Sequence, residues 1–172
     1  PSVMSLAAGG TATGPLASVT DLVIDRFAGN RLLVGLGNVG LTAAPSATAG
    51  LWLSTNGGQS WSQQLGGDAA IANNTLPSGT GVGTVKVAMG QGRSGDQRFV
   101  YVFIGTPPGD NTPPNRNLGG FTGLFKSSDN LANFTEVMLR QDTIPGAGAN
   151  FQDITFGTET SYAASLVIDP NN

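Results

Sequence analysis

Cysteine and histidine are both absent from the 172 residues of this chain. Without these two residue types, the chain cannot supply a Ser-His-Asp triad, a Cys-His pair or a typical zinc site. Disulfide bonds are excluded for the same reason. Any catalysis by these residues would therefore depend on carboxylate, tyrosine, lysine or arginine side chains. We expect neither a metal ion nor a cofactor.

Charged residues are scarce as well, at 11% of the chain, and the formal net charge is −3. A surface that binds nucleic acid needs clustered cations, and the chain has only 8 lysine and arginine residues in total. No apolar run approaches the roughly 18 residues that indicate a membrane-spanning helix. We therefore expect no nucleic-acid partner and no membrane span.

The residues that are abundant indicate a β-sheet protein. Glycine occurs 26 times and proline 10 times, and short β-branched segments alternate between apolar and polar positions. The sustained apolar spacing of a long helix is not found. Strands are predicted over residues 19–25, 31–37, 50–54, 60–65, 84–89 and 98–105.

An internal repeat organises these strands. Residues 50–65 align without a gap with residues 123–138, and both segments read Gly-Leu-aromatic-x-Ser-[Ser/Thr]-[Asn/Asp], with a second aromatic seven positions after the first serine. Residues 166–169 then repeat residues 22–25 at about twice that spacing. Four short strands per unit at a fixed period are typical of β-propeller blades. The alternative is a β-sandwich with a chance similarity.

The sequence thus predicts an all-β fold: a β-propeller fragment of about two four-stranded antiparallel blades plus the start of a third. Residues 1–18 are an N-terminal segment or a strand of a preceding blade, 19–81 the first blade, 82–157 the second and 158–172 the start of the third. Propellers close with about four to eight blades. We therefore expect the chain to be part of a longer polypeptide, or to pack against further blades supplied by other subunits.

The first unit carries a family resemblance in Ser54, Asn56, Gly58 and Trp61. This pattern resembles the Asp-box (bacterial neuraminidase, BNR) repeat, Ser-x-Asp-x-Gly-x-x-Trp, with an asparagine at the aspartate position. Asp-box propellers include sialidases, xyloglucanase-type glycoside hydrolases and sortilin-type receptors. The resemblance implies two Asp-box blades, and a secreted protein that is extracellular, periplasmic or on the cell surface.

The second unit keeps Ser127 and Asp129, while Leu131 replaces the glycine and Phe134 the tryptophan. In both units the Asx side chain is suited to accept hydrogen bonds from the following backbone N–H groups, and the aromatic ring to bury itself under the turn. We therefore interpret the motif as a structural turn. Its members are Ser54, Asn56, Gly58, Trp61, Ser127, Asp129 and Phe134.

Candidate ligand contacts lie in loops, where propellers carry function. They are Asp96, Asp110, Asn111 and Arg116. Each of them could equally be a solvated loop residue. Asp142 and Asp153 also fall in loop-like segments, whereas the strand-end aspartates Asp21, Asp25 and Asp169 are expected to cap turns.

A sialidase would need an arginine cluster and a Tyr–Glu nucleophile pair. The tyrosines are Tyr101 and Tyr162 and the glutamates Glu136 and Glu159, but Tyr101 falls in a strand that is predicted to be buried. The favoured interpretation is a non-catalytic recognition or scaffold module that binds protein or glycan through its inter-strand loops. The alternative is part of a carbohydrate-active propeller enzyme, a glycoside hydrolase of the xyloglucanase or sialidase type, with carboxylate acid/base chemistry.

Overall fold

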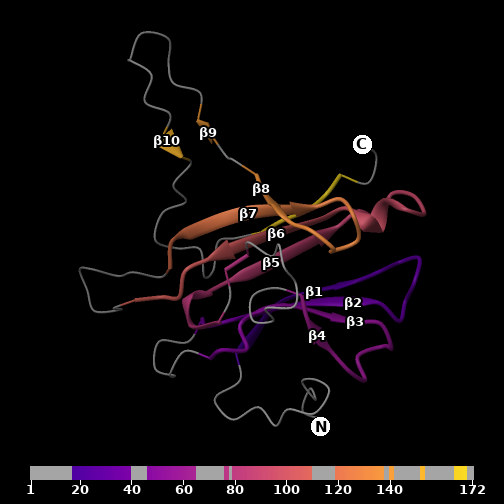
Figure 1. Ribbon diagram of the computed structural model, residues 1–172, viewed down its shortest axis with the longest axis horizontal. Coiled ribbons are helices and arrows are strands. Elements are labelled where there is room, and N and C mark those ends of the chain that lie inside the picture. The colour runs from indigo at the N-terminus through magenta and orange to yellow at the C-terminus, as the bar shows by residue number, and fades with distance from the viewer. Residues whose placement is uncertain are drawn as a thin grey trace.

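The computed structural model describes residues 17–39, 46–64, 76–77, 79–109, 119–137, 140–141, 152–153 and 165–169. Within these residues the chain forms two four-stranded antiparallel sheets that lie one above the other (Figure 1), and a separate two-stranded pair. In the described part of the chain, regular helix is limited to two single 3-10 turns, η1 (Gly79–Gly81) and η2 (Asp96–Arg98). The all-β prediction is confirmed, and two four-stranded sheets of this kind are compatible with a propeller fragment.

The first sheet holds four strands in the order in which they occur along the chain. These are β1 (Ser18–Ile24), β2 (Leu32–Gly37), β3 (Gly50–Ser54) and β4 (Ser62–Gln63), each antiparallel to the next. The register of β1 against β2 shifts between Val19 and Asp21, which leaves Thr20 as a bulge. Bulges of this kind locally increase the twist of a strand. The outermost strand is only two residues long, shorter than the predicted 60–65.

The second sheet repeats this order. Its strands are β5 (Val85–Met89), β6 (Val100–Gly105), β7 (Phe121–Ser127) and β8 (Thr135–Glu136). A separate two-residue pair, β9 (Arg140–Gln141) with β10 (Gln152–Asp153), was not predicted from the sequence. The described residues 165–169 carry no strand, so the start of a third blade remains a prediction.

One hydrophobic core lies between the two sheets. It joins Leu33, Ala49 and Leu51 of the first sheet to a larger set from the second, and the innermost strands β1 and β5 lie side by side there. The members from the second sheet and its turns are Val85, Val87, Met89, Val100, Val102, Ile104, Phe125, Leu131 and Phe134. Burial of this apolar surface, at about 25 cal/mol per Å², stabilises the packing of the two sheets.

A smaller cluster lies on the opposite face of the first sheet. Val34, Leu36, Trp52 and Trp61 are buried there. Cross-strand partners share a face of a sheet, so Leu22, which pairs with Val34, belongs to this side. The first sheet therefore has two apolar faces, of which one covers the second sheet.

Candidate functional site

The turn between β3 and β4 is closed by side chains of the first repeated motif. Ser54 Oγ accepts hydrogen bonds from the N–H groups of Asn56 (3.3 Å) and Gly58 (2.8 Å), and it donates to Asn56 Oδ1 (3.0 Å). Asn56 Oδ1 also accepts from the N–H of Ser60 at 2.9 Å. The Trp61 indole donates to the carbonyl oxygen of Gly58 at 3.0 Å. These side chains are therefore bound to one another and to their own turn.

The turn between β7 and β8 repeats this network. Ser127 Oγ accepts from the N–H groups of Asp129 (3.5 Å) and Leu131 (2.9 Å) and donates to Asp129 Oδ1 (2.9 Å). Asn133 donates its side-chain amide to Asp129 Oδ2 (2.7 Å) and its backbone N–H to Oδ1 (3.0 Å). Hydrogen bonds from the side chain and backbone of Asn133, and from Ser127, favour the carboxylate form and hold the pKa of Asp129 below its ordinary value.

Both turns use the left-handed backbone conformation at two successive residues. In the first turn these are Gly57 (φ 71°) and Gly58 (φ 87°), and in the second Asn130 (φ 63°) and Leu131 (φ 75°). Leucine rarely adopts this conformation. Here its N–H is bound to the motif serine and its side chain is buried beside Phe134 in the core. Packing thus compensates for the glycine that the second motif lacks.

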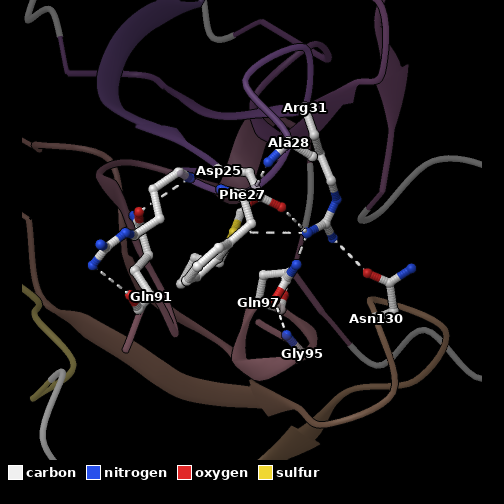
Figure 2. Close-up of polar contacts among 10 residues, drawn as sticks. Asp25, Phe27, Ala28, Arg31, Gln91, Gly95, Gln97 and Asn130 are labelled. Atoms are coloured by element: carbon white, nitrogen blue, oxygen red, sulfur yellow. Dashed lines mark hydrogen bonds and ion pairs between the residues drawn. The ribbon is translucent and has the colours of Figure 1, made fainter. Parts of the chain in front are cut away.

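A polar cluster links the two sheets beside these turns (Figure 2). Asp25, which is 1% exposed, accepts from the N–H groups of Phe27 (2.8 Å) and Ala28 (3.1 Å) through Oδ1. Its Oδ2 lies 3.3 Å from Nη1 of Arg31, a side chain that is 12% exposed. The sequence predicted Asp25 to cap a turn, and it does so, but it also orients a nearly buried guanidinium.

Arg31 extends from the first sheet to two loops of the second. Its Nη1 donates to the carbonyl oxygen of Gln97 at 3.3 Å, and its Nη2 donates to Asn130 Oδ1 at 2.7 Å (Figure 2). Nearby, the exposed Arg26 donates its backbone N–H and its Nη1 to Gln91 at 3.3 Å and 3.0 Å. The hairpin between β1 and β2 is therefore fastened to the second sheet at several points.

The free edge of β5 is covered by side chains of β1. Thr20 Oγ1 donates to the carbonyl oxygen of Val85 (2.7 Å) and accepts from its N–H (3.2 Å). Asp21 accepts from the N–H of Val87 at 2.9 Å, and Lys86 Nζ donates to the carbonyl oxygen of Thr20 at 2.7 Å. An exposed strand edge invites pairing with other chains, so these side chains take the place of a neighbouring strand.

The predicted ligand contacts are only partly described. Asp96 begins η2, and its Oδ2 accepts from the N–H of Arg93 at 2.7 Å, so its carboxylate is engaged within its own turn. Asp110, Asn111 and Arg116 lie outside the described residues. The same is true of Asp142, and nothing is described of the side chain of Asp153. The loop contacts therefore stay predictions.

The residues considered for a Tyr–Glu pair have other surroundings. Tyr101 is half-buried rather than buried, and the ammonium of Lys126 lies 5.6 Å from its ring centroid. The same ammonium lies 5.8 Å from the ring of Phe99. Glu136 is exposed at the end of the second sheet, and Tyr162 and Glu159 lie outside the described residues. The contacts of Lys126 with Tyr101 and Phe99 are cation–π contacts.

Among the described residues, no group of three or more Asp or Glu side chains is placed to hold a metal ion. The same part of the chain contains no helix long and apolar enough to cross a membrane. The arrangement that the described residues do form is a set of turns and cross-sheet links whose polar atoms are engaged with one another.

Comparisons with known proteins assign no family to the chain. No protein-family model matches the chain, and no curated protein matches it. Among solved structures, the chain is similar to an ancestral GH74 enzyme at 18% sequence identity and a TM-score of 0.38. That alignment covers 70% of this chain and 12% of the enzyme chain.

Proposed function

We propose that this chain is a scaffold module of a secreted or cell-surface Asp-box propeller: two successive blades that hold inter-strand loops in place for binding a protein or glycan ligand. The two motif turns support the Asp-box assignment, because Ser54 and Ser127 head the same hydrogen-bond network in both. Their side chains are used inside the turns, so ligand recognition falls to the loops, where Asp110, Asn111 and Arg116 are the candidates.

The observation that carries the proposal is that the aspartate carboxylates accept hydrogen bonds from the backbone. Four of them, Asp21, Asp25, Asp96 and Asp129, have carboxylate oxygens that accept backbone N–H groups at 2.7 to 3.1 Å. A glycoside hydrolase needs two carboxyl groups facing one substrate, about 5 to 10 Å apart. Carboxylates that close turns and bridge sheets are instead suited to fixing the architecture.

The test separates structural from catalytic carboxylates. Asp21, Asp25, Asp96 and Asp129 are replaced singly by asparagine, and each variant is assayed for chemical unfolding and for hydrolysis of xyloglucan, β-glucans and sialosides. We expect a lower unfolding free energy for Asp25→Asn and no hydrolysis by the parent chain or any variant. Hydrolysis by the parent chain that disappears with one substitution, at unchanged stability, would overturn the proposal in favour of a glycoside hydrolase.

Ligand binding is tested separately on the loop. The chain is screened against immobilised oligosaccharides, and the double variant Asp110→Ala/Arg116→Ala is compared with the parent. The matched control is Asp96→Ala, a loop carboxylate that the structure shows engaged in its own turn. We expect the loop variant to lose binding that the control retains. Equal binding by all three proteins would move the ligand site away from this loop.

A further inference from the structure

Four turns lie at one end of the two sheets (Figure 1). They join β1 to β2, β3 to β4, β5 to β6 and β7 to β8, and because these pairs are antiparallel, the connections from β2 to β3 and from β6 to β7 are at the opposite end. Arg31 links the turns of the two sheets through its hydrogen bonds to Gln97 and Asn130. Residues 25–31, 55–61, 90–99 and 126–134 form this end, the turn end.

The turn end is basic, although the chain as a whole is acidic. It carries five of the 8 lysine and arginine residues and three of the 11 aspartate and glutamate residues, so its formal charge is +2 and that of the rest of the chain −5. The cations are Arg26, Arg31, Arg93, Arg98 and Lys126, and the carboxylates are Asp25, Asp96 and Asp129. A charge separation of this kind steers an approaching anion toward the basic end.

The carboxylates of the turn end do not neutralise its outer cations. Asp25 is buried and paired with Arg31, which is the single ion pair among the described residues. Asp96 and Asp129 accept hydrogen bonds inside their own turns. Within the part of the chain that the structure describes, four cations are therefore left without a carboxylate in ion-pair contact: Arg26, Arg93, Arg98 and Lys126.

Aromatic rings hold three of these four cations. The Arg98 guanidinium lies 4.7 Å from the centroid of the Phe99 ring, and the Lys126 ammonium lies 5.8 Å from the same centroid. These two charges can therefore be no further apart than 10.5 Å, the sum of the two distances. Arg26 lies over the ring of Phe27 in the same way, at 5.1 Å. A guanidinium that rests on a ring still presents its N–H edge to an anion.

The pair on Phe99 brings two like charges close together. At an ionic strength of about 0.1 M the screening length is about 10 Å, so Arg98 and Lys126 repel each other with only partial screening. An anion from outside the chain would remove this repulsion and would be attracted by both groups at once. The pair is therefore arranged for an anionic ligand before that ligand arrives.

We propose that the turn end binds an acidic polysaccharide, whose carboxylate or sulfate groups pair with Arg98 and Lys126. Arg26 extends the same surface, because it is bound through Gln91 to the turn between β5 and β6. Arginine binds a planar anion through two parallel N–H groups, and lysine acts as a point charge. The inference requires the packing of the two sheets, and it does not depend on their assignment as propeller blades.

This surface differs from the one assigned to the proposed function. Asp110, Asn111 and Arg116 belong to the connection from β6 to β7, which leaves and enters the sheet at the end opposite the turn end. The two sites can therefore be tested independently of each other.

Two other kinds of polyanion fit the turn end less well. A protein interface has an apolar centre, whereas Phe27 is the only large hydrophobic side chain of the described turn end that is classed as exposed, at 40%. Single-stranded nucleic acid needs aromatic faces on which its bases can stack. The rings of Phe27 and Phe99 already carry arginines of this chain. The cations are thus the main groups that the turn end presents, and an anionic sugar chain requires no more.

The test compares two double variants that lose the same charge. Arg98→Gln/Lys126→Gln removes the pair on Phe99, and Lys86→Gln/Arg116→Gln removes two cations outside the turn end. Titration calorimetry measures binding of polygalacturonate and of dextran sulfate at about 0.1 M salt. We expect the first variant to bind at least about tenfold more weakly than the parent, as for the loss of two charge-assisted hydrogen bonds. The control should bind as the parent does.

The two polymers separate the two sources of negative charge. Tighter binding of polygalacturonate assigns the site to carboxylates and tighter binding of dextran sulfate assigns it to sulfates, and either result supports the inference. Raising the salt from about 0.1 M to about 1 M shortens the screening length from about 10 Å to about 3 Å and should abolish binding. Urea unfolding of each variant checks that the fold is kept.

Several outcomes would overturn the inference. The parent chain would then bind neither polysaccharide, or its binding would persist at high salt. Equal weakening in the two double variants would mean that net charge alone drives binding. Equally tight binding of polyglutamate or of a single-stranded oligonucleotide would replace the polysaccharide by another polyanion. Weakening only in Lys86→Gln/Arg116→Gln would move the site away from the turn end and leave the proposed function standing.

Discussion

The carbonyl oxygen of Val85 lies so close to Gly35 that a Cβ atom there would stand 2.6 Å from it. The Val85 side chain would be met as well, at 2.9 Å from Cγ1. Real Cβ atoms are not found at such distances from backbone, so the strands β2 and β5 are packed as closely as two backbones with one glycine allow. The close approach of the two sheets at this point therefore requires a residue without a Cβ atom.

Gly35→Ala should therefore destabilise the chain by about 1 to 3 kcal/mol, the usual cost of adding a methyl group to a packed core. The measurement is the free energy of unfolding in urea. Gly29→Ala is the matched control, because a Cβ there meets nothing within 4 Å. A Gly35→Ala variant as stable as the Gly29→Ala variant would contradict the close approach of β2 and β5.

Arg31→Met should lower the unfolding free energy by about 3 kcal/mol or more, because it leaves the Asp25 carboxylate buried without its partner. Arg26→Met is the control: this exposed arginine also reaches the second sheet, through Gln91, and its loss should cost less than about 1 kcal/mol. If the two substitutions lowered the unfolding free energy equally, burial of the Asp25–Arg31 pair would not explain its contribution to stability.

Asp129 should make stability depend on pH. Its pKa in the folded chain is lowered, chiefly by the hydrogen bonds from Asn133, so the ionised carboxylate stabilises the fold at neutral pH. That contribution persists down to the ordinary aspartate pKa of about 3.9 and is lost as the pH falls from there through the lowered value. Unfolding of the parent and of Asp129→Asn, a change that copies the asparagine of the first turn, is compared between pH 7 and pH 2. The difference between them should shrink with acidification, and a constant difference would be inconsistent with this role.

Gly57→Ala should cost about 1 to 2 kcal/mol, because φ is 71° and an L-residue is strained in this conformation. Steric contact does not contribute, since a Cβ at Gly57 meets nothing within 4 Å. The thermal midpoint measures the effect, with Gly29→Ala again as the control for added volume. A midpoint that does not change would mean that the turn relaxes out of the left-handed region.

The sequence was sufficient for those parts of the fold that depend on local pattern. Strand β3 occurs at its predicted residues, 50–54, and both motif turns lie where the repeat places them. Leu131 was identified as a departure from the motif, but the left-handed conformation at that residue was not foreseen. Core packing and the Ser127 hydroxyl hold this conformation, and neither is visible in a sequence window.

The cross-sheet cluster could not be predicted for a different reason. Arg31 was assigned to the start of a strand, and its partner Asn130 lies 99 residues later in the chain. Sequence spacing carries no information on which loops meet across two sheets. Likewise, Asp21 was expected to cap a turn, whereas the structure shows its carboxylate on the N–H of Val87 in the next sheet. A hydrophobic pattern defines the faces of a sheet and leaves open which polar groups meet between sheets.

The strand order has a consequence for how the chain folds. Every strand in both four-stranded sheets pairs with its neighbour along the chain, so each sheet can form from contacts of short sequence separation. The links between the sheets, from Thr20 to Val85 and from Arg31 to Asn130, close loops of 65 and 99 residues and cost more chain entropy than the hairpins do. The sheets should therefore form first and join afterwards. On unfolding, amide protons at the junction should exchange before those in the middle of either sheet.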